Sequence, residues 1–471
     1  MKHILYMVLL TLFVTHKAVA GETTVIHAGW LLAVPGASPV ERQSIIIEND
    51  RILQITDGFI SRSELSDSAV PVRFVDLSQA YVLPGLIDSH VHLASAPEAG
   101  SMRKALSQTE ADLTLTASYH AQLTLQAGFT TVVDLGSIGT PGHENAIFGV
   151  RDAVASGKLA GPRVLAAGTP IAATSLTRAA VYRDEINATI DTRSVCDGPD
   201  DCRRAVRHQV KRGSDIIVFF NTGSLLSINP VTQAMTDDEM QAIVETAHSL
   251  GRKVIADGHH AAGIAAAVRA GADVIDSAHL YDDDTFALLG DDVFLQSHIY
   301  GVVMAVGDTP DTLRDGLWGW LPDPILKRLY AIRQNPFAVI KAYEYGIRNL
   351  AYASDAGVYT WGDNAGDFAE FVKRGMSQSE AIQTATVNAA RMLGLEKELG
   401  SIEPGKRADI IATAGNPLAD ISELMHIHFV MRDGVIYRLN NNGVTALTAD
   451  TENFRHDFSF NRRNYYEMAS R

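Results

Sequence analysis

Short apolar runs recur through the middle of the chain and predict its architecture. Eight such runs alternate with longer, helix-like stretches: "VLPGLIDSHV", "TTVVDLG", "RVLAAG", "DIIVFFN", "KVIADGH", "DVIDSAH", "VFLQSHI" and "NLAYASDAG". Continuous apolar runs are typical of strands buried on both faces, and strand–helix alternation is typical of a parallel sheet. Eight units predict an α/β fold, a (β/α)₈ TIM-like barrel over residues 85–401. A doubly wound open sheet would not need eight units.

Helix starts within this region are marked by capping boxes. Thr236 stands three residues before Glu239, and Ser377 stands three residues before Glu380. A hydroxyl at the N-cap with a glutamate three positions later satisfies two exposed backbone N–H groups, so each pair predicts the start of a helix.

Both ends of the chain have a different pattern of apolar residues. "TTVIHAGWLLAV" and "QSIIIENDRILQI" lie near the start, and "GKRADIIAT" and "FVMRDGVIYRL" lie near the end. These are short β-type runs, with turn signals at Asn49-Asp50 and Asp433-Gly434. They predict a small β-sandwich domain formed from residues 22–84 and 402–440, followed by a packed or ordered C-terminal tail at 441–471.

The first twenty residues have the organisation of a secretory signal. Lys2 and His3 precede an apolar run over 4–14, and Ala18-Val19-Ala20 offers small residues for cleavage after Ala20. The run is too short to span a bilayer comfortably. We therefore expect a periplasmic or secreted protein with no stable membrane anchor after cleavage.

The net charge limits the classes of partner, and the cysteine content bears on the redox compartment. The net charge of −15 argues against nucleic acid and anionic membrane surfaces. A small-molecule substrate is the expected partner, and the sequence leaves the oligomeric state open. The two cysteines, Cys196 and Cys202, lie close together in "CDGPDDC". In an oxidising compartment they could form a small-loop disulfide, and two free, partly buried thiols are the alternative.

Histidines at the end of the first barrel strand introduce candidate chemistry. His90 and His92 are two residues apart, so they share one face of a strand and could hold one metal ion. Asp355 ends the eighth run, and strands one and eight are neighbours in a closed barrel. Active sites in this fold lie at the C-terminal ends of the strands, so we expect the three side chains to lie close together. A second pair, His426-x-His428, is interpreted as a surface feature.

The ordered motifs resemble those of the amidohydrolase superfamily, in its imidazolonepropionase-like or Xaa-Pro-dipeptidase-like branch. They are "LPGLIDSHVH", "AGFTTVVDLG", "SGKLAGPRVLAAG", "ASDAG", "AIQTATVNAARMLGL" and "LGSIEPGKRADII". The resemblance implies a hydrolase with two divalent ions, usually zinc, bridged by hydroxide and a carboxylated lysine. Its implied ligands are His-x-His on strand one, the lysine on strand four, one histidine each on strands five and six, and the strand-eight aspartate.

Only part of that ligand set is present. His90, His92 and Asp355 match, but the resemblance places Val218 at the lysine, Asp257 at the strand-five histidine and Ser277 at the strand-six histidine. A valine cannot carry a bridging carbamate, so we expect one ion, the zinc usual in the family, rather than two.

Other residues could complete a one-ion site. Asp257 is itself a potential oxygen ligand. Alternatively, His259 and His279, each two residues beyond the matched position, could act as a shifted pair. A two-residue shift keeps the strand face but moves each side chain about 6–7 Å along the strand, so the loops would have to rebuild the site.

Substrate contacts are less defined. After "RVLAAG" the family typically has a "TGGHG"-like loop, where this chain has "TPIAATSLTRAA". Arg178 or Tyr182 could bind a substrate carboxylate there, with a surface charge and a packed ring as the alternatives. His298, at the end of strand seven, could face the pocket or belong to a loop.

Three functional hypotheses follow. The first is an exported hydrolase of amide-type C–N bonds (in a non-classical peptide, an N-acyl amino acid or a cyclic amide), in which Asp355 takes a proton from metal-activated water. The second is a degenerate amidohydrolase-fold binding protein without turnover. The third is a one-metal enzyme, deaminase- or cyclic-amidase-like, that uses Asp257 or His259 in place of the lost partner.

Overall fold

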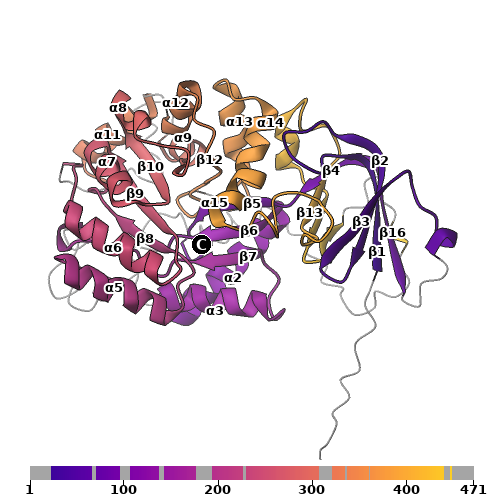
Figure 1. The fold of residues 1–471 in the computed structure, drawn as a ribbon, viewed down its shortest axis with the longest axis horizontal. Coiled ribbons are helices and arrows are strands. Elements are labelled where there is room, and N and C mark those ends of the chain that lie inside the picture. The colour runs from indigo at the N-terminus through magenta and orange to yellow at the C-terminus, as the bar shows by residue number, and fades with distance from the viewer. Residues whose placement is uncertain are drawn as a thin grey trace, which may run out of the picture.

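The computed structural model describes residues 23–65, 71–95, 107–136, 143–176, 194–225, 230–306, 321–334, 337–359, 361–439 and 446–447. The predicted signal at 1–20, the candidates Arg178 and Tyr182, and most of the predicted tail lie outside these ranges. Figure 1 shows a barrel of strands and helices beside a smaller sheet.

All eight predicted barrel strands are present. They are β5 (Leu86–Val91), β6 (Phe129–Asp134), β7 (Arg163–Ala166), β8 (Ile217–Phe220), β9 (Val254–His260), β10 (Val274–Leu280), β11 (Phe294–Gln296) and β12 (Leu350–Ala351). Parallel pairing joins β5-β6-β7 and β8-β9-β10-β11-β12. Two parallel bridges, Ile171 with Phe219 and Val91 with Ala356, connect these sheets at both seams. The strands therefore close into the barrel that the sequence predicts.

Helices follow the strands around the barrel (Figure 1). The described α-helices are α2 (Glu110–Gln126), α3 (His143–Ala155), α5 (Pro199–Arg212), α6 (Asp237–Ser249), α7 (Ala261–Ala270), α8 (Asp283–Ala287), α9 (Tyr300–Val306), α11 (Asp323–Gln334), α12 (Ala338–Tyr345), α13 (Gly366–Lys373), α14 (Gln378–Gln383) and α15 (Ala389–Leu393). Thr236 forms the predicted capping box with Glu239 at α6, and the Ser377 hydroxyl accepts a hydrogen bond from the Glu380 N–H at α14.

Shorter helices complete the described secondary structure. Three are 3₁₀ helices: η1 (Arg62–Leu65), η2 (Thr174–Leu176) and η5 (Ile421–Met425). A π-helical segment, η4 (Thr384–Asn388), joins α14 to α15. None of the helices within the described ranges is long and apolar enough to cross a membrane.

The lower part of the barrel interior is apolar. Each strand contributes one side chain to a single cluster: Ile87, Val133, Leu165, Val218, Ile255, Val274, Phe294 and Ala351. Residues of α15, including Ala389 and Leu393, belong to the same cluster and cover this layer. On β9, alternation places Asp257 and His259 inward beyond Ile255. On β5 the pairing register shifts between Asp88 and Val91, so regular alternation from Ile87 does not extend to His90.

A second sheet is built from both ends of the chain. It contains β1 (Thr23–Leu31), β2 (Val40–Glu48), β3 (Arg51–Asp57), β4 (Val72–Pro84), β13 (Ile410–Thr413), β14 (Phe429–Arg432), β15 (Val435–Leu439) and β16 (Ala446–Leu447). The order is β15-β14-β13-β4-β1-β2-β3, and β16 pairs with β4. Both predicted turns join antiparallel strands, Asn49-Asp50 between β2 and β3, and Asp433-Gly434 between β14 and β15.

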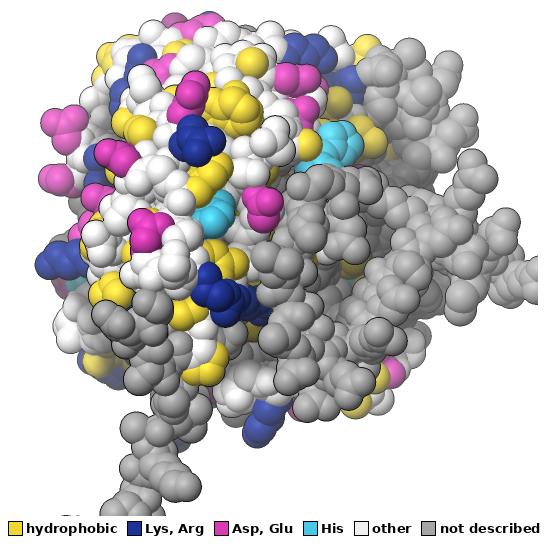
Figure 2. Space-filling view, turned by 90° about the vertical axis from the view of Figure 1, so that its right-hand side faces the viewer, with side chains coloured by type: hydrophobic (Ala, Val, Ile, Leu, Met, Phe, Trp, Pro, Cys, Tyr) yellow, Lys and Arg dark blue, Asp and Glu magenta, His cyan; other side chains and the backbone are white. Residues whose placement is uncertain are grey.

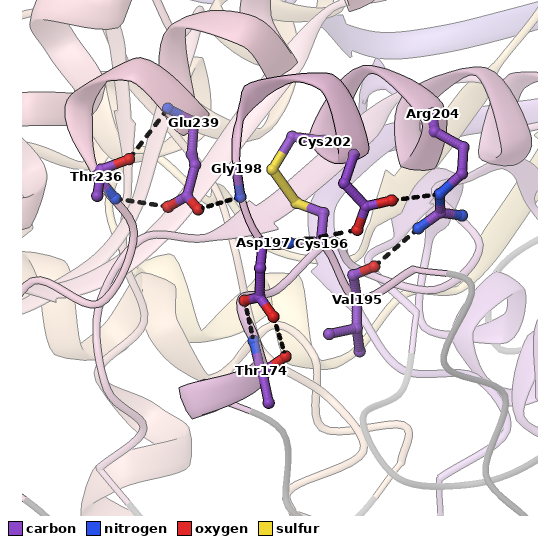
Figure 3. The surroundings of a disulfide bond; sticks show 10 residues. Thr174, Val195, Cys196, Asp197, Gly198, Cys202, Arg204, Thr236 and Glu239 are labelled. Atoms are coloured by element: carbon purple, nitrogen blue, oxygen red, sulfur yellow. Dashed lines mark hydrogen bonds and ion pairs between the residues drawn. A yellow bond between two sulfur atoms is a disulfide. The ribbon is translucent and has the colours of Figure 1, made fainter.

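Cys196 and Cys202 form a disulfide at the start of α5 (Figure 3). Both cysteines are fully buried, so the open question between a disulfide and two thiols is answered by the structure. On the surface, Figure 2 shows acidic, basic and apolar side chains interspersed over the described part of the face in view.

Candidate metal centre

Three side chains meet at the C-terminal ends of neighbouring strands. His90 lies in β5, His92 lies just beyond it, and Asp355 follows β12. The two histidine Nε2 atoms are 3.1 Å apart, and they lie 3.3 Å and 3.1 Å from Asp355 Oδ1. Among the described residues, these three form the group of potential ligands whose donor atoms all lie within 4.8 Å of one another.

Backbone contacts between β5 and β12 hold this arrangement. The Asp355 N–H donates to the His90 carbonyl at 2.9 Å, and the His92 N–H donates to the Ala356 carbonyl at 2.8 Å. The buried Asp88 carboxylate accepts hydrogen bonds from the Ser354 N–H and hydroxyl, at 3.0 and 2.5 Å. Asp355 itself has φ 55°, a left-handed conformation that is uncommon outside glycine. The site therefore depends on closure of the barrel.

The spacing of the three donor atoms fits a divalent ion. Zinc bound to nitrogen and oxygen ligands at about 2.0–2.1 Å in tetrahedral geometry separates its ligands by about 3.3 Å. The observed separations of 3.1–3.3 Å agree with one triangular face of such a tetrahedron. Asp355 Oδ1 is buried and has no hydrogen-bond partner. Two imidazoles and a carboxylate thus form a three-ligand set among the described residues, which is the number of protein ligands usual in catalytic zinc sites.

Each ligand side chain has an outer partner. His92 Nδ1 lies 2.5 Å from the Gly136 carbonyl, which can only accept, so this nitrogen carries the proton. His90 Nδ1 lies 3.0 and 3.2 Å from the two oxygens of Asp276. His298 Nε2 lies 3.3 Å from Asp355 Oδ2. Such contacts fix ring and carboxylate orientation around a metal.

Electrostatics at the centre favour positive charge. Burial opposes a charge on His90, but the carboxylates of Asp276 and Asp355 outweigh it and raise the pKa of His90 to about 10. Burial also opposes ionisation of Asp355, yet His298 and His90 hold its pKa below its usual range. The carboxylates that favour an imidazolium here would equally attract a divalent cation.

Two neighbouring aspartates have pKa values that are shifted in opposite directions. Asp257 on β9 and Asp276 on β10 are paired in register. Burial and the negative charge of Asp276 raise the pKa of Asp257 well above its usual value. Burial also disfavours the charge on Asp276, but His90 holds its pKa below the usual value. Asp276 is therefore the more readily ionised member of the pair.

The substituted positions lie inside the barrel. Val218, at the position implied for lysine, belongs to the apolar interior layer and is buried. Asp257, at the position implied for the strand-five histidine, has a buried Oδ1 without a partner. Asp257, His259 and His279 are not in the three-ligand group. The spacing of the donor atoms therefore does not support their predicted role as ligands.

His259 and His279 nevertheless meet each other. Their Nδ1 atoms are 3.2 Å apart, and the His279 ring lies 4.9 Å from that of His298. The expectation that a two-residue shift keeps the strand face does not apply to β10. Ser277 and Ala278 have φ 71° and 52°, and the β9–β10 register shifts beyond Ser277. This bend, which alternation along the sequence does not reveal, re-aims His279 toward His259 and His298.

These three rings are neutral around neutral pH. Burial and the neighbouring His298 lower the pKa of His259 to about 4, and the same two influences hold the pKa of His279 well below its usual value. Burial also lowers the pKa of His298. His298, predicted as a possible substrate contact, thus lies against Asp355 at the candidate centre.

Sequence reasoning missed two contributors. Asp276 lies within the strand motif "DVIDSAH" but precedes the position that the resemblance marks, so nothing singled it out. Gly136, in "VVDLG", contributes only its carbonyl, and a backbone acceptor leaves no residue-type signal. Its φ of 86° and its close approach to Gly168 explain why glycine is required there.

Comparison with known proteins agrees with this fold. The sequence pattern of the Amidohydrolase family matches residues 81–437. Ochratoxinase from Aspergillus niger is 26% identical over 439 residues, covering 85% of this chain and 83% of that protein. A crystal structure of a Xaa-Pro dipeptidase with bound methionine has TM-score 0.78 and 32% identity, covering 88% of this chain and 100% of the other. The crystal structure of the A. niger ochratoxinase, at 24% identity and TM-score 0.73, supports the fold alone.

The closed barrel with a candidate metal centre at its strand ends is the architecture of a metal-dependent hydrolase, and the family match identifies the family. This chain belongs to the amidohydrolase family, as its motifs indicated. It is accordingly a hydrolase acting on carbon–nitrogen bonds. Members of this family generally use a divalent metal, and His90, His92 and Asp355 are the residues positioned to hold one.

Proposed function

We propose that this protein is an exported, metal-dependent amidohydrolase that cleaves an amide-type C–N bond with one divalent ion. The observation that carries the proposal is the triangle of donor atoms formed by His90, His92 and Asp355. Zinc is the favoured ion because two imidazoles and one carboxylate match its usual catalytic ligands.

One ion is favoured over two by the residues around the triangle. A second ion of the family type would need the bridging lysine, and Val218 offers only an apolar side chain there. Asp257 and Ser277 stand where two histidines would be expected. Three substitutions at three separate strands remove the second half of the site, whereas all three ligands of the first half remain.

The chain's own residues would support hydrolysis in the following way. A divalent ion supplies polarisation of a carbonyl group and acidification of water. Neighbouring histidines depress the pKa of Asp355, so it is a carboxylate, and it can take a proton from an attacking water once the ion has acidified that water. His298 holds Oδ2 of Asp355 and so leaves Oδ1 directed at the two ligand histidines.

The substrate class rests on the relatives. A Xaa-Pro dipeptidase and an ochratoxinase both cover most of this chain. We therefore propose a non-classical peptide, an N-acyl amino acid or a cyclic amide as the substrate. A deaminase-like one-metal reaction is the nearest competing chemistry.

Export is supported by two independent features. Residues 1–20 have the organisation of a signal peptide. The Cys196–Cys202 disulfide is of a kind that persists in oxidising compartments. We propose a periplasmic or secreted location for the mature protein.

Metal content is the first test. The mature protein, residues 21–471, would be purified without chelators and analysed for metal per chain, beside a His90→Ala/His92→Ala variant. We expect close to one ion per chain in the parent and none in the variant. Metal-loaded parent protein would then be assayed against dipeptides, N-acyl amino acids and lactams, with a chelated sample as the control.

Each outcome separates the candidate functions. One ion per chain with chelator-sensitive hydrolysis of any of these amides supports the proposal. Two ions would overturn the one-ion assignment. No ion even after zinc is supplied, or one ion with no hydrolysis across the panel and tight metal-independent binding of a small ligand, would favour the degenerate binding protein.

A further inference from the structure

We propose that Asp276 is a positioning residue that orients His90 for metal binding. The proposal rests on the metal centre described above and assigns a role to a residue outside the ligand set. Asp276 lies on β10, which is separated from β12 by β11 in the sheet, and it is 186 positions from His90 in the sequence.

The contact between the two side chains is direct and enclosed. Both Asp276 oxygens face His90 Nδ1, at 3.2 Å for Oδ1 and 3.0 Å for Oδ2. Asp276 is fully buried and His90 is 3% exposed, so water does not compete for this contact. The carboxylate is itself held, because the Ser277 hydroxyl donates to Oδ2 at 3.0 Å.

This geometry selects the form of the imidazole that binds a cation. An ionised carboxylate can only accept hydrogen bonds, so the proton of a neutral His90 ring lies on Nδ1. The lone pair is then on Nε2, the atom that faces His92 and Asp355. A carboxylate behind a ligand histidine also makes the ring a stronger donor to the metal.

Asp257 provides an internal comparison. It is the register partner of Asp276 on the adjacent strand, and its Oδ1 atom is buried in the same part of the barrel. However, its Oδ1 has no hydrogen-bond partner. The two aspartates thus share register and chemistry, but Asp276 is fully buried against His90, whereas Asp257 is half-buried and only its Oδ1 atom is enclosed.

The test compares matched substitutions. Asp276→Asn keeps the shape but allows the amide N–H to donate to Nδ1, which would move the ring proton to Nε2 and block the donor atom. Asp257→Asn makes the same change without a histidine partner. Affinity for Zn²⁺ would be measured by competition with a chelating dye, and Co²⁺-loaded protein would give an absorption spectrum that reports coordination.

We expect Asp276→Asn to weaken Zn²⁺ binding by about 10–100-fold and to alter the Co²⁺ spectrum. Asp257→Asn should change the affinity by less than about threefold and leave the spectrum intact. Melting of each metal-free variant separates orientation from folding, because a purely structural role would lower the melting temperature without changing affinity. Should Asp276→Asn fail to fold, Ser277→Ala releases the carboxylate more gently and should weaken binding by about fivefold.

The outcomes distinguish this inference from the proposed function. Failure of the parent protein to bind metal would remove the metal centre itself. A parent with one ion and unchanged affinity in both Asp276→Asn and Ser277→Ala would overturn the role of Asp276 alone. Equal losses of Zn²⁺ affinity in Asp276→Asn and Asp257→Asn would show that the effect comes from the removal of negative charge near the centre. That result would also overturn orientation of His90 as the cause.

Discussion

Removal of the Cys196–Cys202 disulfide tests how the α5 region is stabilised. Two perturbations are informative: reduction of the parent protein, which keeps both sulfur atoms, and Cys196→Ala/Cys202→Ala, which removes them. Figure 3 shows that the same loop is also held by side-chain and backbone hydrogen bonds. Asp197 binds Thr174, and the Gly198 N–H donates to Glu239 at 2.6 Å.

The magnitude follows from the size of the closed loop. The cysteines are six positions apart, and closing so short a loop lowers unfolded-state entropy by an amount worth about 2 kcal/mol at 25 °C. Reduction should therefore lower the free energy of unfolding by about 2 kcal/mol. The double alanine variant also loses two fully buried sulfur atoms, at about 1 kcal/mol each, for a total of about 4 kcal/mol.

The assay is urea unfolding followed by far-UV circular dichroism for the oxidised, reduced and double-alanine proteins. Hydrogen exchange of the first turn of α5 in the native protein is measured in parallel. Because the neighbouring hydrogen bonds remain, we expect that native exchange changes little and that metal content is unaffected.

Two results would refute this reasoning. A reduced protein as stable as the oxidised one would show that the cross-link does not constrain the unfolded chain. A large rise in native-state exchange at α5 on reduction would show that the disulfide, rather than the Asp197 and Gly198 contacts, holds the loop.

Substitution of Gly136 by alanine should destabilise the protein and weaken metal binding, because the added Cβ would lie 1.9 Å from the Gly168 carbonyl and displace the acceptor of His92. The control Gly149→Ala, exposed in α3 with no atom within 4 Å of the added Cβ, should instead stabilise by about 0.5–1 kcal/mol in urea unfolding. Burial lowers the pKa of His120 to about 4, so between pH 4 and 6.5 the unfolded chain binds more protons and stability rises with pH. His120→Asn should remove up to about 3 kcal/mol of the pH-dependent change in the free energy of unfolding. If that free energy, measured at several pH values, changed with pH as steeply as in the parent protein, this account would be contradicted.

Local patterns determined the fold class and the core of the candidate centre. Eight buried-strand runs separated by helices specify a closed parallel barrel, because each strand must be covered on both faces. Parallel strands place their carboxyl ends at one edge, so His90, His92 and Asp355 could be grouped although they come from opposite ends of the barrel sequence. The absence of lysine at position 218 was likewise visible in the sequence.

Tertiary structure alone decided how that centre is supported. The Asp276–His90 contact crosses the barrel interior, and the Gly136 carbonyl is a backbone atom that every residue type carries. The left-handed conformations at Ser277 and Ala278 redirect His279, which strand alternation cannot predict. Sequence spacing describes neighbours along one strand, whereas contacts between strands depend on closure, local φ angles and burial, which arise only when the whole chain has folded.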